Sequence, residues 1–336
     1  MRRLQISFIQ NKPLVFAALA AAALLAAAAS LCFGSSGLSA ADTLRALFGQ
    51  GEASAVAIAR HVRAPRTLAA VLCGAGLAVG GAVIQGVLGN PLAGPNIIGV
   101  NAGAGFFAIL VSAAAPEVYG LVPLAAFVGA LAACFLVYGL ARRTGASRIT
   151  LVLAGVAVSS MLSAGIDAVA TLAPDAAVGA NSFLVGGLSG VTLQRLVLPG
   201  ALIAAGLLAA FALHTELDIL SLGDDVARSV GLAAAPVRCL LLGAAAVLCG
   251  ASVSFAGLVG FVGLIVPHAA RFLVGGESRA LLPASALLGA ALVAGCDTLA
   301  RVLFAPFELP VGILLSLLGG PFFLWLLFRQ RGGRLS

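Results

Sequence analysis

Residues 67–116 read TLAAVLCGAGLAVGGAVIQGVLGNPLAGPNIIGVNAGAGFFAILVSAAAP, and this stretch contains no charged residue. As one α-helix it would be about 75 Å long, whereas the hydrocarbon core of a bilayer is about 30 Å thick. The chain must therefore break within the stretch. The segment Asn90–Pro95 is the obvious place, because its two prolines and its glycine end helices. The stretch thus predicts two membrane-spanning helices.

The composition of the whole chain indicates the same environment. Of the 336 residues 61% are hydrophobic and 9% are charged, whereas soluble domains carry about 25% charged residues. The 42 glycines suit the close approach of transmembrane helices. The alternating segments of about ten residues that are typical of a transmembrane β-barrel are not found in the sequence. We therefore predict an all-α polytopic membrane protein.

Apolar runs of about 20 residues divide a single transmembrane domain, residues 1–336, into ten predicted spans. An outer loop, 34–66, contains a short helix that begins after Ser39 and ends at Gly49. A cytoplasmic loop covers 216–236. The predicted spans are 13–33, two within 67–116, about 121–141, about 149–172, 196–215, two within 239–270, about 280–296, and 309–328.

The distribution of basic residues predicts the orientation. Arginine and lysine cluster between the apolar runs, which is typical of membrane topology rather than of nucleic-acid binding. With a cytoplasmic N-terminus, thirteen basic residues lie in inner segments and six in outer ones, so both termini are predicted to be cytoplasmic. The inner residues are Arg2, Arg3, Lys12, Arg142, Arg143, Arg148, Arg228, Arg238, Arg271, Arg279, Arg329, Arg331 and Arg334; the outer ones are Arg45, Arg60, Arg63, Arg66, Arg195 and Arg301.

The first apolar run and the cysteines could suggest a signal peptide and redox chemistry, but both are interpreted as parts of membrane-spanning helices. The first apolar run, Pro13–Phe33, follows two arginines as in a signal peptide, but its 21 residues are enough to span a membrane. The six cysteines form no C-x-x-C pair and are interpreted as small apolar side chains. They are Cys32, Cys73, Cys134, Cys239, Cys249 and Cys296.

A short repeated segment within the sequence suggests inverted repeats. Val71–Ala75 recurs as Val247–Ala251, at an offset of 176 residues. Because the two copies would run in opposite directions through the membrane, they predict the inverted repeats that many transporters contain. The other matches at this offset are Gly81 with Gly257, Pro91 with Pro267 and Gly99 with Gly275.

The chain lacks a nucleotide-binding motif. A P-loop needs a lysine followed by serine or threonine, but the only lysine, Lys12, is followed by Pro13. We therefore predict that the chain is not an enzyme and that a partner or an ion gradient drives transport. An ion-driven secondary transporter would require intramembrane acids around an ion site. A membrane-embedded enzyme would require clustered histidine, aspartate or cysteine.

The inner segment 217–232 predicts a short cytoplasmic helix. Ser221 and Asp224 have the spacing of a capping box, Asp224 and Asp225 favour the N-terminal end of a helix, and Arg228 favours the other end. Gly231 can terminate the helix. Two interpretations remain: a connector on the membrane surface, or a rigid handle that a cytoplasmic partner moves.

Several sequence motifs, which are given at the end of this paragraph in their order along the chain, resemble those of the FecCD family of ABC importer permeases. The resemblance covers about residues 38–327. Members of that family carry ferric siderophores, haem or cobalamin. The resemblance implies ten helices per subunit, a second copy of the chain, two cytoplasmic ABC ATPase subunits and an external substrate-binding protein. The motifs are Arg63-Ala64-Pro65-Arg66, Gln85, Asn90-Pro91-Leu92-Ala93, Gly99, the inner segment 217–232, Gly260–His268 with Arg271, and Glu308–Gly312.

The resemblance also implies roles for individual residues. The inner helix would be the coupling helix that contacts the ATPase, with Leu222, Gly223, Asp224, Asp225, Ala227, Arg228 and Gly231. Arg63, Arg66 and Arg301 would face outward and pair with acids of the binding protein, in keeping with the bidentate pairing of arginine; headgroup contact is the alternative. Asn90, Pro91 and Leu92 would help to close the inner gate, or form a turn without that role.

The remaining polar residues of the spans give weaker signals. A carboxylate in mid-membrane costs about 2.5–3.5 kcal/mol, so Asp167 and Asp297 are expected to face protein or water. Asp167 would line the pathway or lie at a helix end. The histidines His61, His214 and His268 predict no metal site, and His268 is placed in an inner Pro–His turn. No cofactor is expected.

The apolar spans suit a bulky chelate better than a bare cation. A ferric siderophore is ranked first, haem second and cobalamin third, with selectivity residing largely in the binding protein. The predicted location is the bacterial inner membrane.

Overall fold

A computed structural model describes residues 11–143 and 148–332, and the regular elements in these ranges are all helices. Arg2, Arg3 and Arg334 lie outside the described residues. In the described part, seven helices are long and apolar enough to cross a membrane, and three shorter apolar helices accompany them. These ten helices correspond to the ten predicted spans and confirm the all-α polytopic fold. The long helices are α2 (Lys12–Cys32), α5 (Ala64–Leu88), α7 (Val122–Arg143), α8 (Arg148–Leu172), α10 (Leu193–Ala212), α13 (Ala234–Ala256) and α15 (Ser278–Val302). The shorter apolar stretches are α6 (Val100–Ala114), α14 (Val262–Val274) and Val311–Leu324, which is the first part of the long helix α16 (Val311–Gly332).

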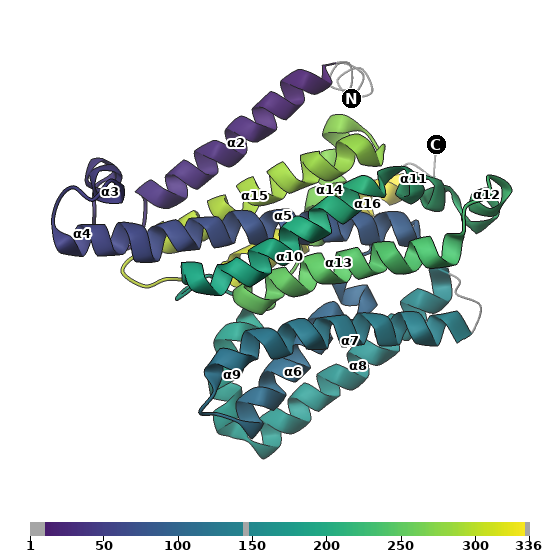
Figure 1. Ribbon diagram of the computed structural model, residues 1–336, viewed down its shortest axis with the longest axis horizontal. Helices are drawn as coiled ribbons and strands as arrows, with labels where there is room; N and C mark the ends of the chain where they lie inside the picture. Colours follow the sequence, from purple (N-terminus) through teal and green to yellow (C-terminus); the bar gives the residue numbers. More distant parts are fainter. Residues whose placement is uncertain (1–10, 144–147, 333–336) are drawn as a thin grey trace.

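Helix α5 is the centre of the molecule. In its most apolar stretch 83% of the residues are buried, whereas α2, α8 and α10 reach only 17–22%. It packs against α13, α14 and α15, and in Figure 1 it runs through the middle of the fold. Helices α6 to α9 form a second group beside α13.

Glycines allow the neighbours of α5 to approach its backbone. A Cβ added to Gly81 would lie 1.9 Å from the carbonyl oxygen of Gly263 in α14. One added to Gly74 would lie 2.1 Å from the carbonyl oxygen of Gly289 in α15. Both distances are far below van der Waals contact, and the obstacle is backbone rather than a movable side chain. The small residues therefore fix the helix spacing in the core.

The two ends of the helices have distinct sets of contacts. One end holds the start of α2 and the connection between α14 and α15, joined by the Lys12–Glu277 pair at 3.1 Å. It also holds α11 (His214–Leu222) and α12 (Asp224–Ser229), because Asp218 of α11 accepts a hydrogen bond from the Ser278 amide at 3.0 Å. The opposite end carries α3 (Ala40–Leu47) and α4 (Ala53–Ile58). Figure 1 shows the start of α2 at the end where α11 and α12 lie.

The outer loop differs in part from the prediction. Helix α3 begins after Ser39, as expected, and the Ser39 Oγ accepts a hydrogen bond from the Asp42 amide at 3.1 Å. The rest of segment 34–66 is not an irregular polar loop, because α4 continues through a π-helical turn, Ala59–Arg63, into α5. Helix α9 (Pro174–Val185) was not predicted, because its 12 residues are too few for a span.

Residues of the repeated segments that are 176 positions apart do not all occupy equivalent positions in the structure. Gly81 lies within α5, whereas Gly257 follows the end of α13. Pro91 lies in the turn after α5, whereas Pro267 lies inside α14. What does recur is a succession of a long, a short and two long helices, in α5 to α8 and again in α13 to α16. The loops between them differ in length, so one offset cannot align both halves.

Substituting Gly81 with valine should destabilise the fold. The added side chain meets the Gly263 carbonyl, so α5 and α14 must separate, at a cost of about 1–3 kcal/mol or more. Thermal unfolding of the detergent-solubilised protein should show a lower midpoint. Gly139→Val is the matched control, because a Cβ at Gly139 of α7 meets no atom within 4 Å; an equal loss in both variants would contradict the packing argument.

Candidate functional site

A buried ionic network ties the helices together at the α3–α4 end. The Asp297 side chain is fully buried and accepts hydrogen bonds from Arg66 at 2.9–3.1 Å, while Arg301 forms an ion pair with it at 3.0 Å. Arg66 also donates to Glu308 at 2.6 Å, and Ser35 donates to the other oxygen of Glu308 at 2.6 Å. Each buried charge therefore has an opposite partner, which such burial requires.

Hydrogen bonds to the backbone connect the same arginines to the end of α2. Arg301 donates to the carbonyl oxygens of Ser30 and Phe33, both at 3.1 Å. Arg63 donates to the Cys32 carbonyl at 2.7 Å and to the Thr43 hydroxyl at 2.7 Å. The network thus joins α2, α3, α5 and α15 at one end of the bundle.

This geometry corrects one expectation. Arg63, Arg66 and Arg301 were expected to face outward, but their exposed fractions are 2%, 5% and 3%. Their guanidinium groups are occupied by partners in the same chain. A role in docking a binding protein stays a prediction, but it cannot rest on free surface arginines. The i, i+4 spacing of Asp297 and Arg301 was the signal in the sequence for the internal pair.

Glu308 is the most accessible member of the network, with 31% of its side chain exposed. Burial by itself raises its pKa, but hydrogen bonds from Ser35 and Arg66 and the charges of Arg66 and Arg301 outweigh it and lower the pKa below its ordinary value. A carboxyl whose pKa is lowered by folding stabilises the fold at neutral pH and loses that effect as the pH falls through the lowered value. The Arg66–Glu308 pair is therefore intact at physiological pH.

The α11–α12 end carries the predicted coupling segment. Helix α12 has Asp224 and Asp225 in its first turn and Arg228 in its last. The Gly231 amide donates to the Arg228 carbonyl, and Gly231 has a φ of +80°, as a terminating glycine requires. Asp224 forms an ion pair with Arg238 of α13, and Arg228 pairs with Asp225 at 2.6 Å. Leu222, Gly223 and Ala227 lie in the same segment, with Ala227 buried.

The predicted capping box is wrong. Ser221 belongs to the last turn of α11, and its hydroxyl donates to the Asp218 carbonyl at 2.7 Å. Gly223, with a φ of 122°, separates α11 from α12 and has no side chain to cap it. Sequence spacing alone cannot reveal that Ser221, the expected cap of α12, already belongs to the preceding helix α11.

The turn predicted at Asn90–Leu92, called the inner turn below, follows directly after α5. Asn90 accepts a hydrogen bond on its side-chain oxygen from the Leu92 amide at 2.9 Å, and Pro91 lies between them. Helix α6 begins at Val100, after a single 3-10 turn at Pro95–Ile98. The predicted break of the charge-free stretch is therefore confirmed, whereas a gating role stays a prediction.

One arginine joins three elements beside this turn. Arg148, the first residue of α8, donates to the carbonyl oxygens of Leu220 at 2.5 Å and Ser221 at 3.2 Å. A Cβ at Gly89 would lie 2.1 Å from the Arg148 guanidinium, so a side chain there would displace Arg148, and the φ of +58° also favours glycine. In the sequence Arg148 is recognisable only as a positive charge between two spans, and no motif links it to residues 72 and 73 positions away.

The neighbouring polar contact lies between α5 and α14. Gln85 accepts a hydrogen bond from Arg271 and donates to the Gly263 and Leu264 carbonyls at 3.3 Å. His268 lies inside α14 with its ring 4.9 Å from that of Phe272, so the expected Pro–His turn is wrong. In the described residues, no group of three histidine, cysteine, aspartate or glutamate side chains is placed to hold a metal ion.

Helix α8 exposes a polar stripe. Asp167 is exposed on it, as are Ser160, Ser163 and Thr171. These residues recur every three to four positions and share one face. Asp297, by contrast, faces protein, as expected of a carboxylate in an apolar span.

Comparison with known proteins decides the family. The FecCD transport family matches residues 21–329. The chain belongs to the FecCD transport family. It is 38% identical over 283 residues to the hemin transport system permease protein HmuU of Yersinia pestis, covering 82% of this chain and 84% of that protein. It is 42% identical to the iron(3+)-hydroxamate import system permease protein FhuB of Bacillus subtilis, covering 82% and 72%.

A solved structure agrees with this assignment. An inward-facing conformation of a metal-chelate type ABC transporter superposes with a TM-score of 0.84 at 29% identity, covering 94% of this chain and 99% of that one. This FecCD chain is therefore the permease subunit of an ABC transporter and not its ATPase, as predicted. The alternatives of an ion-driven carrier and a membrane enzyme are not supported.

Replacing Asp297 with asparagine should strongly destabilise the FecCD fold. Arg66 and Arg301 would then share a buried site without a carboxylate between them, and breaking a buried pair typically costs about 3–5 kcal/mol. The midpoint of thermal unfolding in detergent is the measurement. Glu308→Gln serves as the comparison, because Glu308 is partly exposed and its loss should cost less; equal midpoints for the two variants would contradict the role assigned to Asp297.

Proposed function

We propose that two copies of this chain form the channel of an ATP-driven importer of a metal chelate in the bacterial inner membrane. The observation that supports it best is the junction at Arg148. This residue joins the coupling segment to the start of the polar-striped α8, directly beside the inner turn. A movement of the segment is thereby passed to a helix and a turn that can open or close a channel.

The proposed assembly contains two cytoplasmic ABC ATPases and one external substrate-binding protein. The α12 end also holds the start of α2, and it carries ten of the thirteen inner basic residues, all of them within the described ranges. The positive-inside rule then makes this end cytoplasmic. Helix α12, with its exposed Asp225 and Arg228 side chains, would contact the ATPase.

Two contacts would carry the movement of α12 into the membrane. Asp224 pairs with Arg238, whose side chain is 3% exposed, so α12 is attached to α13. The carbonyls of Leu220 and Ser221 are attached to α8 through Arg148. Asn90, Pro91 and Leu92, next to Gly89, would respond as the inner gate.

Arg148→Gln should uncouple ATP hydrolysis from uptake. The substitution removes a charged donor from two carbonyls, a contact worth about 1.5–3 kcal/mol, so the uptake per ATP hydrolysed should fall about tenfold. Proteoliposomes containing the complete transporter provide both rates. Arg279→Gln is the control, since Arg279 is an exposed arginine at the same end. An unchanged ratio for Arg148→Gln would contradict the proposed route.

The channel is proposed to run between two copies along α8. A polar face that is exposed in one chain is costly in lipid, so Asp167 and the serines of α8 would face water at the axis between the subunits. The rest of the exposed α8 surface is apolar, which suits weak contacts with a bulky ligand. The names of the relatives, hemin and iron(3+)-hydroxamate permeases, support such a ligand. A ferric siderophore is ranked first, haem second and cobalamin third.

Docking of the binding protein is proposed at the α3–α4 end. Glu308 is the accessible partner of Arg66, so a carboxylate of the binding protein would take its place on the guanidinium. Arg63 and Arg301 would hold this surface in shape through their bonds to α2. The same end also exposes Arg45 and Arg60.

Affinity measurements can distinguish docking at Arg66 from docking at the exposed Arg45 and Arg60. Arg66→Gln should weaken binding of the cognate binding protein to the transporter in nanodiscs about tenfold, because a charge-assisted pair is lost. Glu308→Gln should leave binding unchanged or strengthen it, since it frees Arg66. If Arg45→Gln and Arg60→Gln weaken binding while correctly folded Arg66→Gln does not, the docking assignment of Arg66 is wrong.

A further inference from the structure

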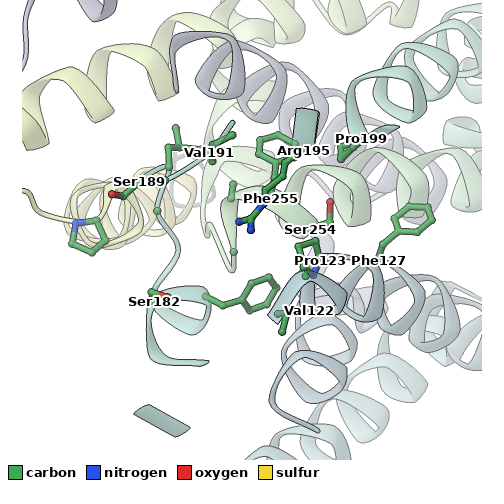
Figure 2. Close-up of a pocket in the computed structure, with 18 of the residues that line it drawn as sticks. Val122, Pro123, Phe127, Ser182, Ser189, Val191, Arg195, Pro199, Ser254 and Phe255 are labelled. Atoms are coloured by element: carbon green, nitrogen blue, oxygen red, sulfur yellow. The ribbon is translucent and has the colours of Figure 1, made fainter. Parts of the chain in front are cut away.

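A cavity of about 560 Å³ opens at the α3–α4 end between the two helix groups. Its walls come from the starts of α7 and α10, the end of α13, α9 and the segment 187–191. Figure 2 shows side chains from these elements converging on one space, with Arg195 among them. Of the transport roles described above, only the proposed docking contact at Arg66 and Glu308 borders this cavity.

The cavity contains one uncompensated positive charge. Its charged lining residues are Arg66, Arg195 and Glu308. Arg66 is neutralised by Asp297 and Glu308. Among the described residues no ion pair or side-chain hydrogen bond is found for Arg195, and as the third residue of α10 it lies at the end of the helix that disfavours cations. An anionic group would therefore be stabilised beside Arg195.

The other walls suit an amphiphile. Phe127, Phe183 and Phe255 supply apolar surface. The hydroxyls of Ser182 and Ser189 and the amide of Gln194 are exposed at the cavity and can bind phosphate or glycerol oxygens. The arginine and the hydroxyls would contact the phosphate and glycerol of a lipid headgroup. The aromatic rings would contact the start of its acyl chains.

The mouth of the cavity continues into the lipid-facing surface. Leu124 of α7 and Leu198 of α10 line it, and their exposed fractions are 53% and 62%. On the same helices Val128, Leu193 and Val197 are 47%, 50% and 72% exposed, as expected of residues that contact acyl chains. A molecule in the bilayer can thus enter from the side without crossing the aqueous phase.

We infer that this cavity binds an anionic phospholipid of the outer leaflet, with its phosphate at Arg195 and its chains along Leu124 and Leu198. The leaflet follows from the orientation proposed above, whereas the binding itself does not depend on it. The bound lipid would fill the space between α7, α9 and α10. It would thereby brace the two helix groups against each other next to the docking surface.

Lipid-specific fluorescence quenching tests the inference in the full-length protein. The only tryptophan, Trp325, is replaced by phenylalanine, and Leu124→Trp places a reporter at the mouth. Nanodiscs of phosphatidylcholine then contain a small fraction of either brominated phosphatidylglycerol or brominated phosphatidylcholine. One arginine near a phosphate should give the anionic lipid about a fivefold preference, seen as stronger quenching. Both leaflets carry the probe, so a wrong orientation does not affect the result.

Three controls make the result decisive. Arg195→Gln should abolish the preference, whereas Arg45→Gln, an exposed arginine at the same end, should retain it. A reporter at Leu136, which is 51% exposed on α7 away from the cavity, should show no preference. Equal quenching by both lipids at Leu124→Trp, or a preference that survives Arg195→Gln, would overturn the inference. Displacement of the lipid by millimolar glycerol 3-phosphate would instead assign the cavity to a soluble anion and overturn it too.

Discussion

The contact on which this fold depends is the one between glycines of α5 and the backbones of α14 and α15. At Gly81 and Gly74 the neighbouring carbonyl lies where a side chain would begin, so the three helices are held at a spacing that side-chain rotation cannot change. Helix α5 also reaches from the Arg66 network at one end to Gln85 and Gly89 at the other. Because this core is close-packed, a change at either end is more readily passed on as a movement of whole helices than absorbed locally.

The two ends of α5 use buried polar groups in different ways. At the α3–α4 end, Asp297 lies between Arg66 and Arg301, and its loss would leave Arg301 without a carboxylate partner and Arg66 with Glu308 alone. At the α12 end, Arg148 and Arg271 reach backbone carbonyls and an amide. The carboxylates of the ion pairs there are more exposed than Asp297: 34% of the Asp224 side chain and 97% of the Asp225 side chain. Ion pairs between fully buried groups resist rearrangement, whereas a hydrogen bond to a carbonyl can be exchanged for a neighbouring one at little cost. The network at the α3–α4 end therefore suits a fixed platform, and the contacts at the α12 end suit a part that moves.

Much of the fold could be predicted because lipid imposes simple rules. The ten spans followed from charge-free runs, and the break near Asn90 followed from helix length and proline. Helix α9 was missed because a short helix in a membrane protein lacks that length signal. The network around Asp297 and the junction at Arg148 were missed for another reason. Their partners are far apart in sequence, as with Arg66 and Asp297, so only the packed helices bring them together. Motifs indicated which arginines matter, but not that they are buried.

Helix α8 explains why one copy of the chain is not sufficient. Only 17% of its most apolar stretch is buried, which alone would be compatible with a lipid-facing helix such as α2. Its exposed face, however, carries Asp167 with two serines and a threonine, and α2 has nothing comparable on its exposed surface. A carboxylate in contact with acyl chains costs about 2.5–3.5 kcal/mol, so this face requires water or protein opposite it. In the proposed dimer, a second copy related by a two-fold axis would supply both, because it would seal the surface from lipid and leave an aqueous space along the axis. In the proposed assembly, the same polar stripe that makes a single chain unfavourable in lipid would form the wall of the channel.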